Sequence, residues 1–415
     1  MALTDKLTAI AEGFRSSRGT TEKLSLDDMA VLAAENVAPP TQEKTVDITE
    51  NGTAEITADE GYLLSKVTAN VNVASSGGGG ENKLAQVVAK TITEIKKEDI
   101  EGGIAIPQYL FQDCKDLVSV ALPNTITSIE KYAFENCSNL IDISLNEGLE
   151  KIDVGALRDC KNITSIKLPS TLKSLGSQAF AHVYLETLEI PDLVTTLPSQ
   201  LFDSNSKLHT VKIGSGITSI DSFAFYNCNN IGNVYVKDLS QYLRINLGAR
   251  IVGSTAAGGG KLYVNGTLLQ KFILPEEITA LKSHCLSRFN TITEVVLHNN
   301  LITIGYGVFN EMKGLTNIEI PDSVTTIDNS VFYMTSLKTI VLGSGITSIG
   351  TYMIRYSDKL ELIKIRATTP PAIQSTTLTG IPSACRIEVP AESVEAYKAA
   401  TNWSAYADKI FAIEE

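Results

Sequence analysis

The stretch LVSVALPNTITSIEKYAFENCSN, residues 117–139, decides the fold of this chain because its pattern returns ten more times. Each copy begins at an aliphatic residue, and the steps between copies are 22 or 23 residues, with one step of 38. A fixed period in this range indicates a solenoid, in which each copy buries its apolar side against its neighbours. The eleven copies start at Leu117, Leu140, Ile163, Leu185, Leu208, Ile231, Leu269, Ile292, Leu315, Leu337 and Leu360.

Within a copy, apolar residues recur at offsets 0, 3, 5, 9 and 12 from its first residue, as in Ile163, Ile166, Leu168, Leu172 and Leu175. Offsets 3 and 5 alternate with polar positions, which is the period of a β-strand. Pro or Gly stands at offset 6 in most copies and ends this strand. The second apolar pair predicts another short extended segment on the opposite wall of the solenoid.

An aromatic residue near offset 17 marks the loop that returns the chain to the next copy. Phe134 and Phe225 stand six residues before the next copy, whereas Phe180 and Phe332, in the two 22-residue copies, stand five before it. The missing residue therefore falls in the return loop, because loops absorb deletions that core columns do not. The core is predicted to be a set of ladders of like side chains.

The repeat resembles the BspA-like leucine-rich repeat family, whose copies read L-x-x-I-x-I-P-x-x-V-x-x-I-x-x-x-A-F-x-x-C-x-x. The resemblance spans residues 82–366 and implies a β-rich leucine-rich-repeat solenoid of short strands, turns and short helices. It also implies adhesion or binding rather than catalysis, because the repeat itself carries no catalytic motif.

Four of the six cysteines occupy one column of the repeat. Cys114, Cys137, Cys160 and Cys228 each stand three residues before the next copy, at the family's cysteine position. We expect them to pack in the core rather than to form a disulfide framework, since a free Cys is often buried. Their spacing leaves the redox compartment undecided.

The chain of 415 residues carries a formal net charge of −12 that is spread rather than clustered. This argues against nucleic acid or an anionic membrane as a partner, because both attract dense positive charge. No segment approaches the roughly 18 consecutive apolar residues of a membrane span, so no membrane insertion is expected. Residues 1–20 lack a basic start followed by an apolar block, so no secretory signal is predicted.

The region before the repeats is predicted to be a small α+β module. Residues 1–36 have helical spacing, residues 37–74 form a small β module with an Asn51-Gly52 hairpin signal, and residues 75–81 are a Gly/Ser linker. Residues 3–73 resemble the N-terminal attachment region of tail and fibre proteins from phages and prophages of gut bacteria. The resemblance rests on LTDKLTAIA and GTTEKLSLDDM, followed by an EKTV…NGT…DEGY…KVT unit. A generic oligomerising or capping module is the alternative.

The 38-residue step contains an insertion at residues 237–266. It predicts a short helix from Asp238 to Ile245, a glycine-rich loop at 258–260 and a strand with an Asn265-Gly266 turn. The loop lacks the Lys-Ser/Thr ending of a phosphate-binding loop, so no nucleotide is expected there. Contact between this insertion and a ligand stays open, since insertions on one face of a repeat array are often contact sites.

Residues 367–415 resemble the terminal unit of the family and predict a cap over the open apolar end of the solenoid. Arg386–Val389 can form a last strand, after which Val394, Tyr397 and Trp403 can cover the final core layer. Trp403 is assigned to this packing rather than to ligand binding.

No set of residues in the sequence points to catalysis. The four histidines, His182, His209, His284 and His298, are not paired at metal-ligand spacing. No G-x-S-x-G motif occurs, and no Cys–His pair is supported by its context. We therefore predict a protein that is not an enzyme, with no catalytic residue, metal or cofactor, while a glycosidase-like carboxylate pair stays open from sequence alone.

The outward side chains of the first strand, at offsets 2 and 4, are the predicted ligand-binding surface. They are short and polar in the early copies and include apolar residues in the later ones, and exposed apolar side chains in a polar rim can mark an interaction patch. The alternative is that β-branched residues simply favour strands. The candidate ligand-binding residues are Tyr235, Lys271, Ile273, Glu294, Val296, Asn317, Glu319 and Val341.

The two resemblances together predict a phage or prophage-derived tail protein of the virion. Residues 1–73 would contact other virion tail proteins, and the solenoid would act as a receptor-binding structure for a bacterial cell-surface protein or glycan. A homo-oligomer formed through the N-terminal module stays open. The alternative function is a bacterial surface or secreted BspA-like adhesin.

Overall fold

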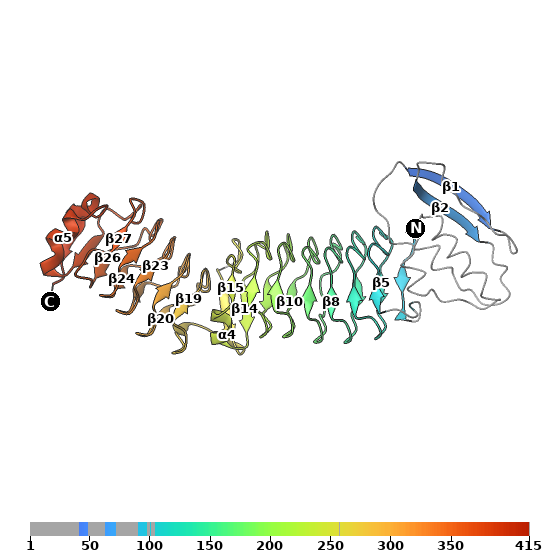
Figure 1. Ribbon diagram of the computed structural model, residues 1–415, viewed down its shortest axis with the longest axis horizontal. Coiled ribbons are helices and arrows are strands. Elements are labelled where there is room, and N and C mark those ends of the chain that lie inside the picture. Colours follow the sequence, from blue (N-terminus) through green and yellow to red (C-terminus); the bar gives the residue numbers. More distant parts are fainter. Residues whose placement is uncertain are drawn as a thin grey trace. The chain divides into compact units, whose positions relative to one another are not determined.

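The computed structural model describes the repeat region and the backbone of two N-terminal strands (Figure 1). The described residues are 90–97, 100, 104–256 and 258–414, with the backbone alone at 41–48 and 63–71.

Two compact units divide the chain. Unit 1 consists of Met1–Glu186 and Pro198–Asn205, and unit 2 of Thr187–Leu197 and Ser206–Glu415. Each unit has its own sheets, which are built mainly from short parallel strands. The β-rich solenoid predicted from the repeat is therefore confirmed over the described copies.

The N-terminal strands β1 (Thr41–Ile48) and β2 (Leu63–Val71) pair in parallel. Both fall within the predicted β module. The Asn51-Gly52 hairpin signal, the helices predicted in residues 1–36 and the linker at 75–81 lie outside the described residues.

Each copy of the repeat folds into one rung with two short strands, as its apolar spacing predicts. In the copy that starts at Leu117, the first strand is β5 (Ser119–Ala121) and the second is β6 (Ser128–Ile129). Val120 and Ile129 are buried, while the residues on either side of Val120 are partly exposed. This alternation places the apolar residues inside and their neighbours outside.

The first strands of successive rungs form the first wall, with parallel pairing in register. Residues 163–168 of unit 1 form no strand. In unit 1 the strands of this wall are β3 (Glu94–Ile95), β5 and β7 (Asp142–Ser144). In unit 2 they are β10 (Thr187–Glu189), β12 (Thr210–Lys212), β14 (Asn233–Val236), β16 (Lys261–Val264), β18 (Lys271–Ile273), β20 (Glu294–Val296), β22 (Asn317–Glu319), β24 (Thr339–Leu342), β26 (Leu362–Ile365) and β28 (Arg386–Val389).

The second extended segment predicted for each copy forms the second wall. In unit 1 its strands are β4 (Ala105–Ile106), β6, β8 (Lys151–Ile152) and β9 (Ser174–Leu175). In unit 2 they are β11 (Thr196–Leu197), β13 (Ser219–Ile220), β15 (Asn246–Leu247), β19 (Ala280–Leu281), β21 (Thr303–Ile304), β23 (Thr326–Ile327), β25 (Ser348–Ile349) and β27 (Ala372–Ile373).

The return loops, at offsets 14–20, are joined by a further ladder of backbone hydrogen bonds. In the loop of residues 131–137, Tyr132, Phe134 and Asn136 donate their backbone N–H groups to carbonyls of the next rung at 2.8–2.9 Å. Tyr132 and Asn136 have left-handed φ angles of 55° and 59°. This conformation is unfavourable for residues other than Gly, so the inter-rung hydrogen bonds are what hold it.

The predicted ladders of like side chains are present in the core. Phe111 stacks on Phe134 with ring centroids 5.1 Å apart, and Phe309 stacks on Phe332 at 5.7 Å. These rings are almost parallel and fully buried. Dispersion contacts between such rings tie each rung to the next one.

The cysteine column packs in the core, as predicted, and it also donates hydrogen bonds. All six cysteines are free and buried. The Cys137 thiol donates to the Phe111 carbonyl at 3.0 Å, and the Cys160 thiol donates to the Phe134 carbonyl at 3.1 Å. Burial raises the pKa of the Cys114 thiol to about 12, so this thiol stays protonated at neutral pH.

Two rungs have another hydrogen-bond donor in place of the cysteine. Asn205 donates its amide N–H to the Phe180 carbonyl at 2.7 Å, and the Ser357 hydroxyl donates to the Phe332 carbonyl at 2.7 Å. Both side chains are fully buried. In these rungs the polar side chain adds a hydrogen bond to the carbonyl, whereas Phe289 and Met312, buried at the same position of later rungs, act there by packing alone.

The insertion forms the elements predicted for it. Helix α4 (Leu239–Leu243) begins after Asp238, whose side chain accepts a hydrogen bond from the Gln241 N–H. Strand β16 continues the first wall, and β17 (Thr267–Leu268) pairs with it antiparallel through an Asn265-Gly266 turn. Both turn residues have positive φ, which Asn and Gly tolerate best. The helix is shorter than predicted because Arg244 already forms its C-cap.

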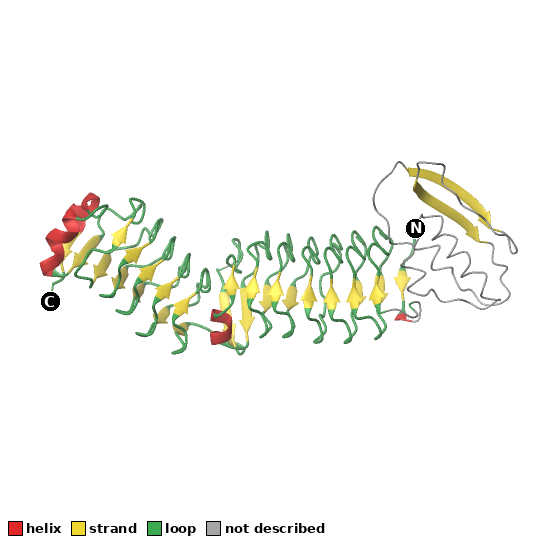
Figure 2. Ribbon diagram, in the orientation of Figure 1, coloured by secondary structure: helices red, strands yellow, loops and turns green. Residues whose placement is uncertain are grey.

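The C-terminal residues contain the predicted strand β28, followed by η2 (Ala391–Ser393), α5 (Val394–Ala399), η3 (Ser404–Lys409) and β29 (Ile410–Ala412). β29 pairs with β28, so Arg386–Val389 is not the last strand as predicted. Figure 2 shows α5 and η3 at this end of unit 2. Among the described residues, no helix has the length and apolar character needed to cross a bilayer.

Cap packing explains the single tryptophan. Trp403 and Tyr397 are buried and meet edge to face, with ring centroids 5.2 Å apart. The Trp403 indole N–H donates to the Pro371 carbonyl at 2.8 Å, and the Tyr397 hydroxyl donates to the Ala367 carbonyl at 2.9 Å. Both polar groups have hydrogen-bond partners inside the protein, and neither side chain is exposed for a ligand to contact.

Candidate binding surfaces

The eight residues predicted to bind a ligand all lie on the outward side of the first wall in unit 2. They do not share one sheet, however. Tyr235 lies on the sheet that ends at β17, the residues of β18 and β20 form a two-stranded sheet, and the residues of β22 and β24 belong to the sheet that ends at β29. The insertion separates Tyr235 from the other seven residues, and a further sheet break falls between β20 and β22; sequence alone revealed neither division.

The middle part of this surface combines an ion pair with two exposed aliphatic side chains. Lys271 Nζ lies 2.7 Å from Glu294 Oε1, and their neighbours Ile273 and Val296 face each other on the same two strands. Ile273 is 57% exposed and Val296 is 40% exposed. The charges of Lys271 and Glu294 compensate each other, so what this part offers a partner is mainly apolar area.

The remaining predicted residues flank this part on other strands. Glu319 pairs with Arg366 at 2.8 Å and faces Val341 across β22 and β24, while Asn317 is exposed on β22. Tyr235 stacks on Tyr263, with ring centroids 4.3 Å apart. Sequence reasoning missed Tyr263, although the alternating run of the inserted strand was a signal that it could continue the wall.

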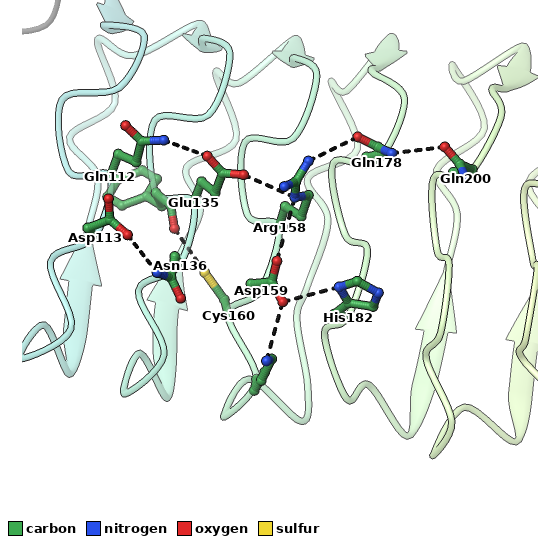
Figure 3. Close-up of polar contacts among 12 residues, drawn as sticks. Gln112, Asp113, Glu135, Asn136, Arg158, Asp159, Cys160, Gln178, His182 and Gln200 are labelled. Carbon is green, nitrogen blue, oxygen red and sulfur yellow. Dashed lines mark hydrogen bonds and ion pairs between the residues drawn. The ribbon is translucent and has the colours of Figure 1, made fainter. Parts of the chain in front are cut away.

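A second surface follows the return loops of unit 1, and we call it the unit 1 loop face (Figure 3). It is formed by residues 108–114, 131–137, 154–160, 177–183 and 199–205. Its charged residues are Asp113, Lys131, Glu135, Arg158, Asp159 and Asp203, which gives a net charge of −2 with His182 neutral.

Polar side chains on the unit 1 loop face bind one another from rung to rung. Gln112 donates to Glu135 at 2.6 Å, and Arg158 pairs with the same carboxylate at 3.0 Å. Arg158 also donates to Gln178 at 3.3 Å, and Gln178 donates to Gln200 at 2.8 Å. Figure 3 shows this row of five side chains crossing successive rungs. The row stabilises the loops and leaves few of its polar groups for a partner.

A second row on the same face is also paired internally. Asn136 donates to Asp113 at 2.6 Å, and Asp159 contacts both His182 at 3.1 Å and Lys161 at 3.4 Å.

The corresponding surface of unit 2, the unit 2 loop face, has a different character. It is formed by the return loops 283–289, 306–312, 329–335 and 351–357, together with Arg250 from the insertion. Its charged residues are three arginines, Arg250, Arg288 and Arg355, against one glutamate, Glu311, which gives a net charge of +2 with His284 neutral.

Two of these arginines share one carboxylate. Arg288 lies 2.6 Å from one oxygen of Glu311, and Arg250 lies 3.7 Å from the other. Arg288 also donates to the Gly253 carbonyl of the insertion at 2.7 Å. Burial, and then the neighbouring Arg288, lower the pKa of the Arg250 guanidinium. Two cations are thus held close together with a single negative charge between them.

A histidine lies beside this cluster. The His284 ring meets Tyr306 edge to face at 4.9 Å, and its Nδ1 atom is buried without a hydrogen-bond partner. Burial, and then the nearby Arg250, lower the pKa of His284. His284 is therefore neutral in the folded protein near neutral pH.

The far end of the unit 2 loop face is a cluster of tyrosines around one arginine. The Arg355 guanidinium lies 5.1 Å from the ring centroid of Tyr352 and 4.8 Å from that of Tyr356. Tyr356 is 50% exposed and meets Tyr333 edge to face at 5.4 Å. Arg355 forms no ion pair with any residue that the structure describes.

Sequence reasoning did not identify the unit 2 loop face. Its residues stand at offsets 14–20, where the chain has no alternating pattern to show which side chains point outward. A comparison of the same offsets between copies would have been the signal, because the loops of the unit 2 loop face hold two arginines and four tyrosines, against one arginine and two tyrosines in the loops of unit 1. The insertion also contributes Arg250 and Gly253 to this face. The question of whether the insertion contacts a ligand therefore becomes the question of what this face binds.

The described part of the chain contains no cluster of side chains suited to bind a metal ion. No group of three or more His, Cys, Asp or Glu residues within it is placed to hold a metal ion. Buried thiols such as Cys285, whose pKa burial raises to about 12, are poorly suited to act as nucleophiles at neutral pH.

The repeats of this chain match a known protein family. Residues 138–246 and 260–378, more than half of the chain, match six copies of the BspA type leucine-rich repeat region. No curated protein matches the sequence. The family match lies outside residues 1–73 and does not bear on the phage-like attachment region predicted there.

Several solved structures are similar to this chain. A leucine-rich repeat protein from Bacteroides ovatus is 18% identical over 72% of this chain and 91% of that one, with a TM-score of 0.34. A leucine-rich cell surface protein from Faecalibacterium prausnitzii is 22% identical over 70% and 81%, with a TM-score of 0.44. The pneumococcal vaccine antigen PcpA is 16% identical over 78% and 85%, with a TM-score of 0.42.

Proposed function

We propose that this chain, which belongs to the BspA type leucine-rich repeat family, is a binding protein that acts at a cell surface and holds its ligand on the exposed sides of its solenoid. The proposal agrees with the adhesin alternative predicted from the repeat. The virion tail function predicted first rests on residues 1–73, and the family match gives it no support.

The observation that carries this proposal is the presence of exposed side chains on a rigid, regularly spaced scaffold. Ile273, Val296 and Tyr356 are each 40% or more exposed, although the strands and loops that carry them are fixed by inter-rung hydrogen bonds. Side chains on such a scaffold lose little conformational freedom when a partner binds. Binding, rather than turnover, is the function that this arrangement favours.

Two surfaces of unit 2 are proposed as contact regions. The outward side of the first wall offers the exposed pair Ile273 and Val296, with Lys271 and Glu294 at its edge. The unit 2 loop face offers arginine and tyrosine, which are enriched where proteins bind partners. The unit 1 loop face is a weaker candidate because its polar side chains already bind one another.

The proposal is tested by measuring how fluorescently labelled full-length protein binds to intact bacterial and epithelial cells over a range of concentrations. We expect saturable binding that excess unlabelled protein displaces. A signal that rises linearly with concentration and is not displaced would contradict a binding function.

The place of action is tested separately in the strain that produces the protein. Mass spectrometry of its envelope, culture medium and purified phage particles should find peptides from the repeats in the envelope or the medium. Peptides from both residues 1–80 and the repeats in purified particles would instead support the virion tail protein.

A further inference from the structure

We propose that the unit 2 loop face binds an acidic polysaccharide, with Arg355 and Arg250 each recognising an oxyanion group of the polymer and the largely buried Arg288 adding positive charge beside Arg250. This inference rests on the proposed binding function and names the chemical class of the ligand.

Uncompensated positive charge is the first reason. In a protein whose net charge is −12, this face carries three arginines and one glutamate. Glu311 is shared by Arg250 and Arg288, and Arg355 has no carboxylate partner among the described residues. A guanidinium presents a planar set of donors that fits carboxylate and sulfate oxygens. An oxyanion here would compensate charge that the protein leaves unpaired.

Aromatic side chains are the second reason. Tyr356 is 50% exposed and Tyr306 is 40% exposed, and both lie beside the arginines of this face. A tyrosine ring offers an apolar surface to the C–H groups of a sugar and a hydroxyl to its polar groups. Arg355 lies against Tyr352 and Tyr356, which holds its guanidinium in place before a ligand arrives.

The spacing of the rungs is the third reason, and it favours a polysaccharide over a peptide. Adjacent parallel strands are about 4.8 Å apart, which is close to the length of one pyranose unit in an extended polysaccharide. An extended peptide advances only about 3.3 Å per residue and would lose register with the rungs. Arg288 and Arg355 are three rungs apart, or about 15 Å, so a short run of sugars could reach both sites.

The experiment measures binding of full-length protein to polygalacturonate, whose oxyanions are carboxylates, and to dextran sulfate, whose oxyanions are sulfates. Methyl-esterified polygalacturonate and dextran are the matched neutral polymers. We expect binding to at least one acidic polymer, weaker binding as salt rises, and no binding to either neutral polymer. Which acidic polymer binds more tightly identifies the oxyanion. Equal binding to acidic and neutral polymers, or no binding to any of them, would overturn the proposal.

Substitutions locate the site. Arg355→Gln should weaken binding about tenfold or more, because it removes a charged donor. Arg355→Lys keeps the charge but not the planar set of donors, and should give an intermediate loss. Lys359→Gln removes the same charge from an exposed position of the same rung and should have little effect. Equal losses in Arg355→Gln and Lys359→Gln would mean general electrostatic attraction rather than a site.

Two further results separate the alternatives. Polyglutamate that binds more tightly than either acidic polysaccharide would show an acidic protein segment to be the better ligand and would overturn the proposal. Thermal unfolding of each variant checks that it is folded, and Tyr356→Ala, which leaves all arginines in place, should also weaken polysaccharide binding. If Arg355→Gln binds cells as the unchanged protein does, the binding function stands and the inference about this face fails.

Discussion

The return loops of the two units share a backbone but carry different side chains. In unit 1 the Tyr132 and Phe134 amides donate to the next rung, and in unit 2 the Phe309 and Glu311 amides do the same at 3.1 and 2.8 Å. The unit 1 loop face has a net charge of −2 and polar rows that bind one another, whereas the unit 2 loop face has a net charge of +2 and exposed tyrosines. The repeat thus fixes the scaffold while leaving the surface free to vary.

The physical reason is that the two kinds of position make different contacts. A side chain such as Phe134 or Phe309 is enclosed by neighbouring rungs, so its size and polarity are restricted. A side chain such as Gln112 or Arg355 is bounded on one side by solvent, so very different residues fit there. Differences between the loop faces therefore concern binding rather than folding.

The largest expected effect tests whether the two cores are equivalent. Phe134→Ala and Phe309→Ala should each lower the free energy of unfolding by about 3–5 kcal/mol, because each removes a fully buried ring from a stack. Urea unfolding followed by circular dichroism measures both. The matched Phe→Leu variants should lose less than about 1.5 kcal/mol. A loss below about 1 kcal/mol in only one Phe→Ala variant would show that the units differ in their cores as well.

The next largest effect on stability tests how well charges are compensated on the two loop faces. Glu135 and Glu311 side chains are each 13% exposed, but Glu135 faces one arginine and Glu311 faces two. Glu311→Gln should cost about 3 kcal/mol, since it leaves the buried Arg288 without its counter-charge. Glu135→Gln should cost about 1 kcal/mol, because Arg158 is closer to solvent. Equal losses in urea unfolding would contradict the view that the arginines of unit 2 are under-compensated.

A smaller effect concerns the donor column, which uses the Cys137 thiol in one rung of unit 1 and the Ser357 hydroxyl in one rung of unit 2. Cys137→Ala and Ser357→Ala should each cost about 1 kcal/mol, because each removes one of the two hydrogen bonds that the Phe111 or Phe332 carbonyl accepts. Cys137→Ser keeps a donor and should cost less than Cys137→Ala by urea unfolding. If the Ser and Ala variants are equally stable, the column acts by packing alone.

The smallest effect is a pH dependence specific to unit 2. Burial lowers the pKa of His284 in the folded state, so below about pH 6.5 the unfolded chain binds a proton that the folded protein does not. The free energy of unfolding should therefore fall as pH drops through this value towards the lowered pKa of the folded state. His284→Gln should remove this part of the pH dependence, measured by urea unfolding at several pH values. An unchanged pH profile would show that His284 does not contribute.

The sequence predicted most of the fold because apolar spacing reports directly on what is buried. Offsets 3 and 12 predicted both walls, Asp238 and Asn265-Gly266 predicted the helix and turn of the insertion, and Trp403 was correctly assigned to packing. The position of β29 was missed because a three-residue strand after a turn has too little pattern to be recognised.

The candidate sites were predicted less completely. The eight residues on the first wall do point outward, but the sheet breaks at the insertion separate Tyr235 from Ile273. Arg355 and Tyr352 stand near each other in the sequence, yet Tyr333 and Tyr356 meet only because two rungs stack. Arg250 and Arg288 share a carboxylate only because the insertion folds back on the next rung.

The sequence by itself determined the repeat, the walls and the composition of the core, because these depend on short-range spacing and on the exclusion of water from apolar side chains. Only the tertiary structure decided which polar side chains neighbour each other, where the sheets break, and which charges stay uncompensated. Those properties depend on contacts between residues about one rung or more apart, and a pattern within one copy does not encode them.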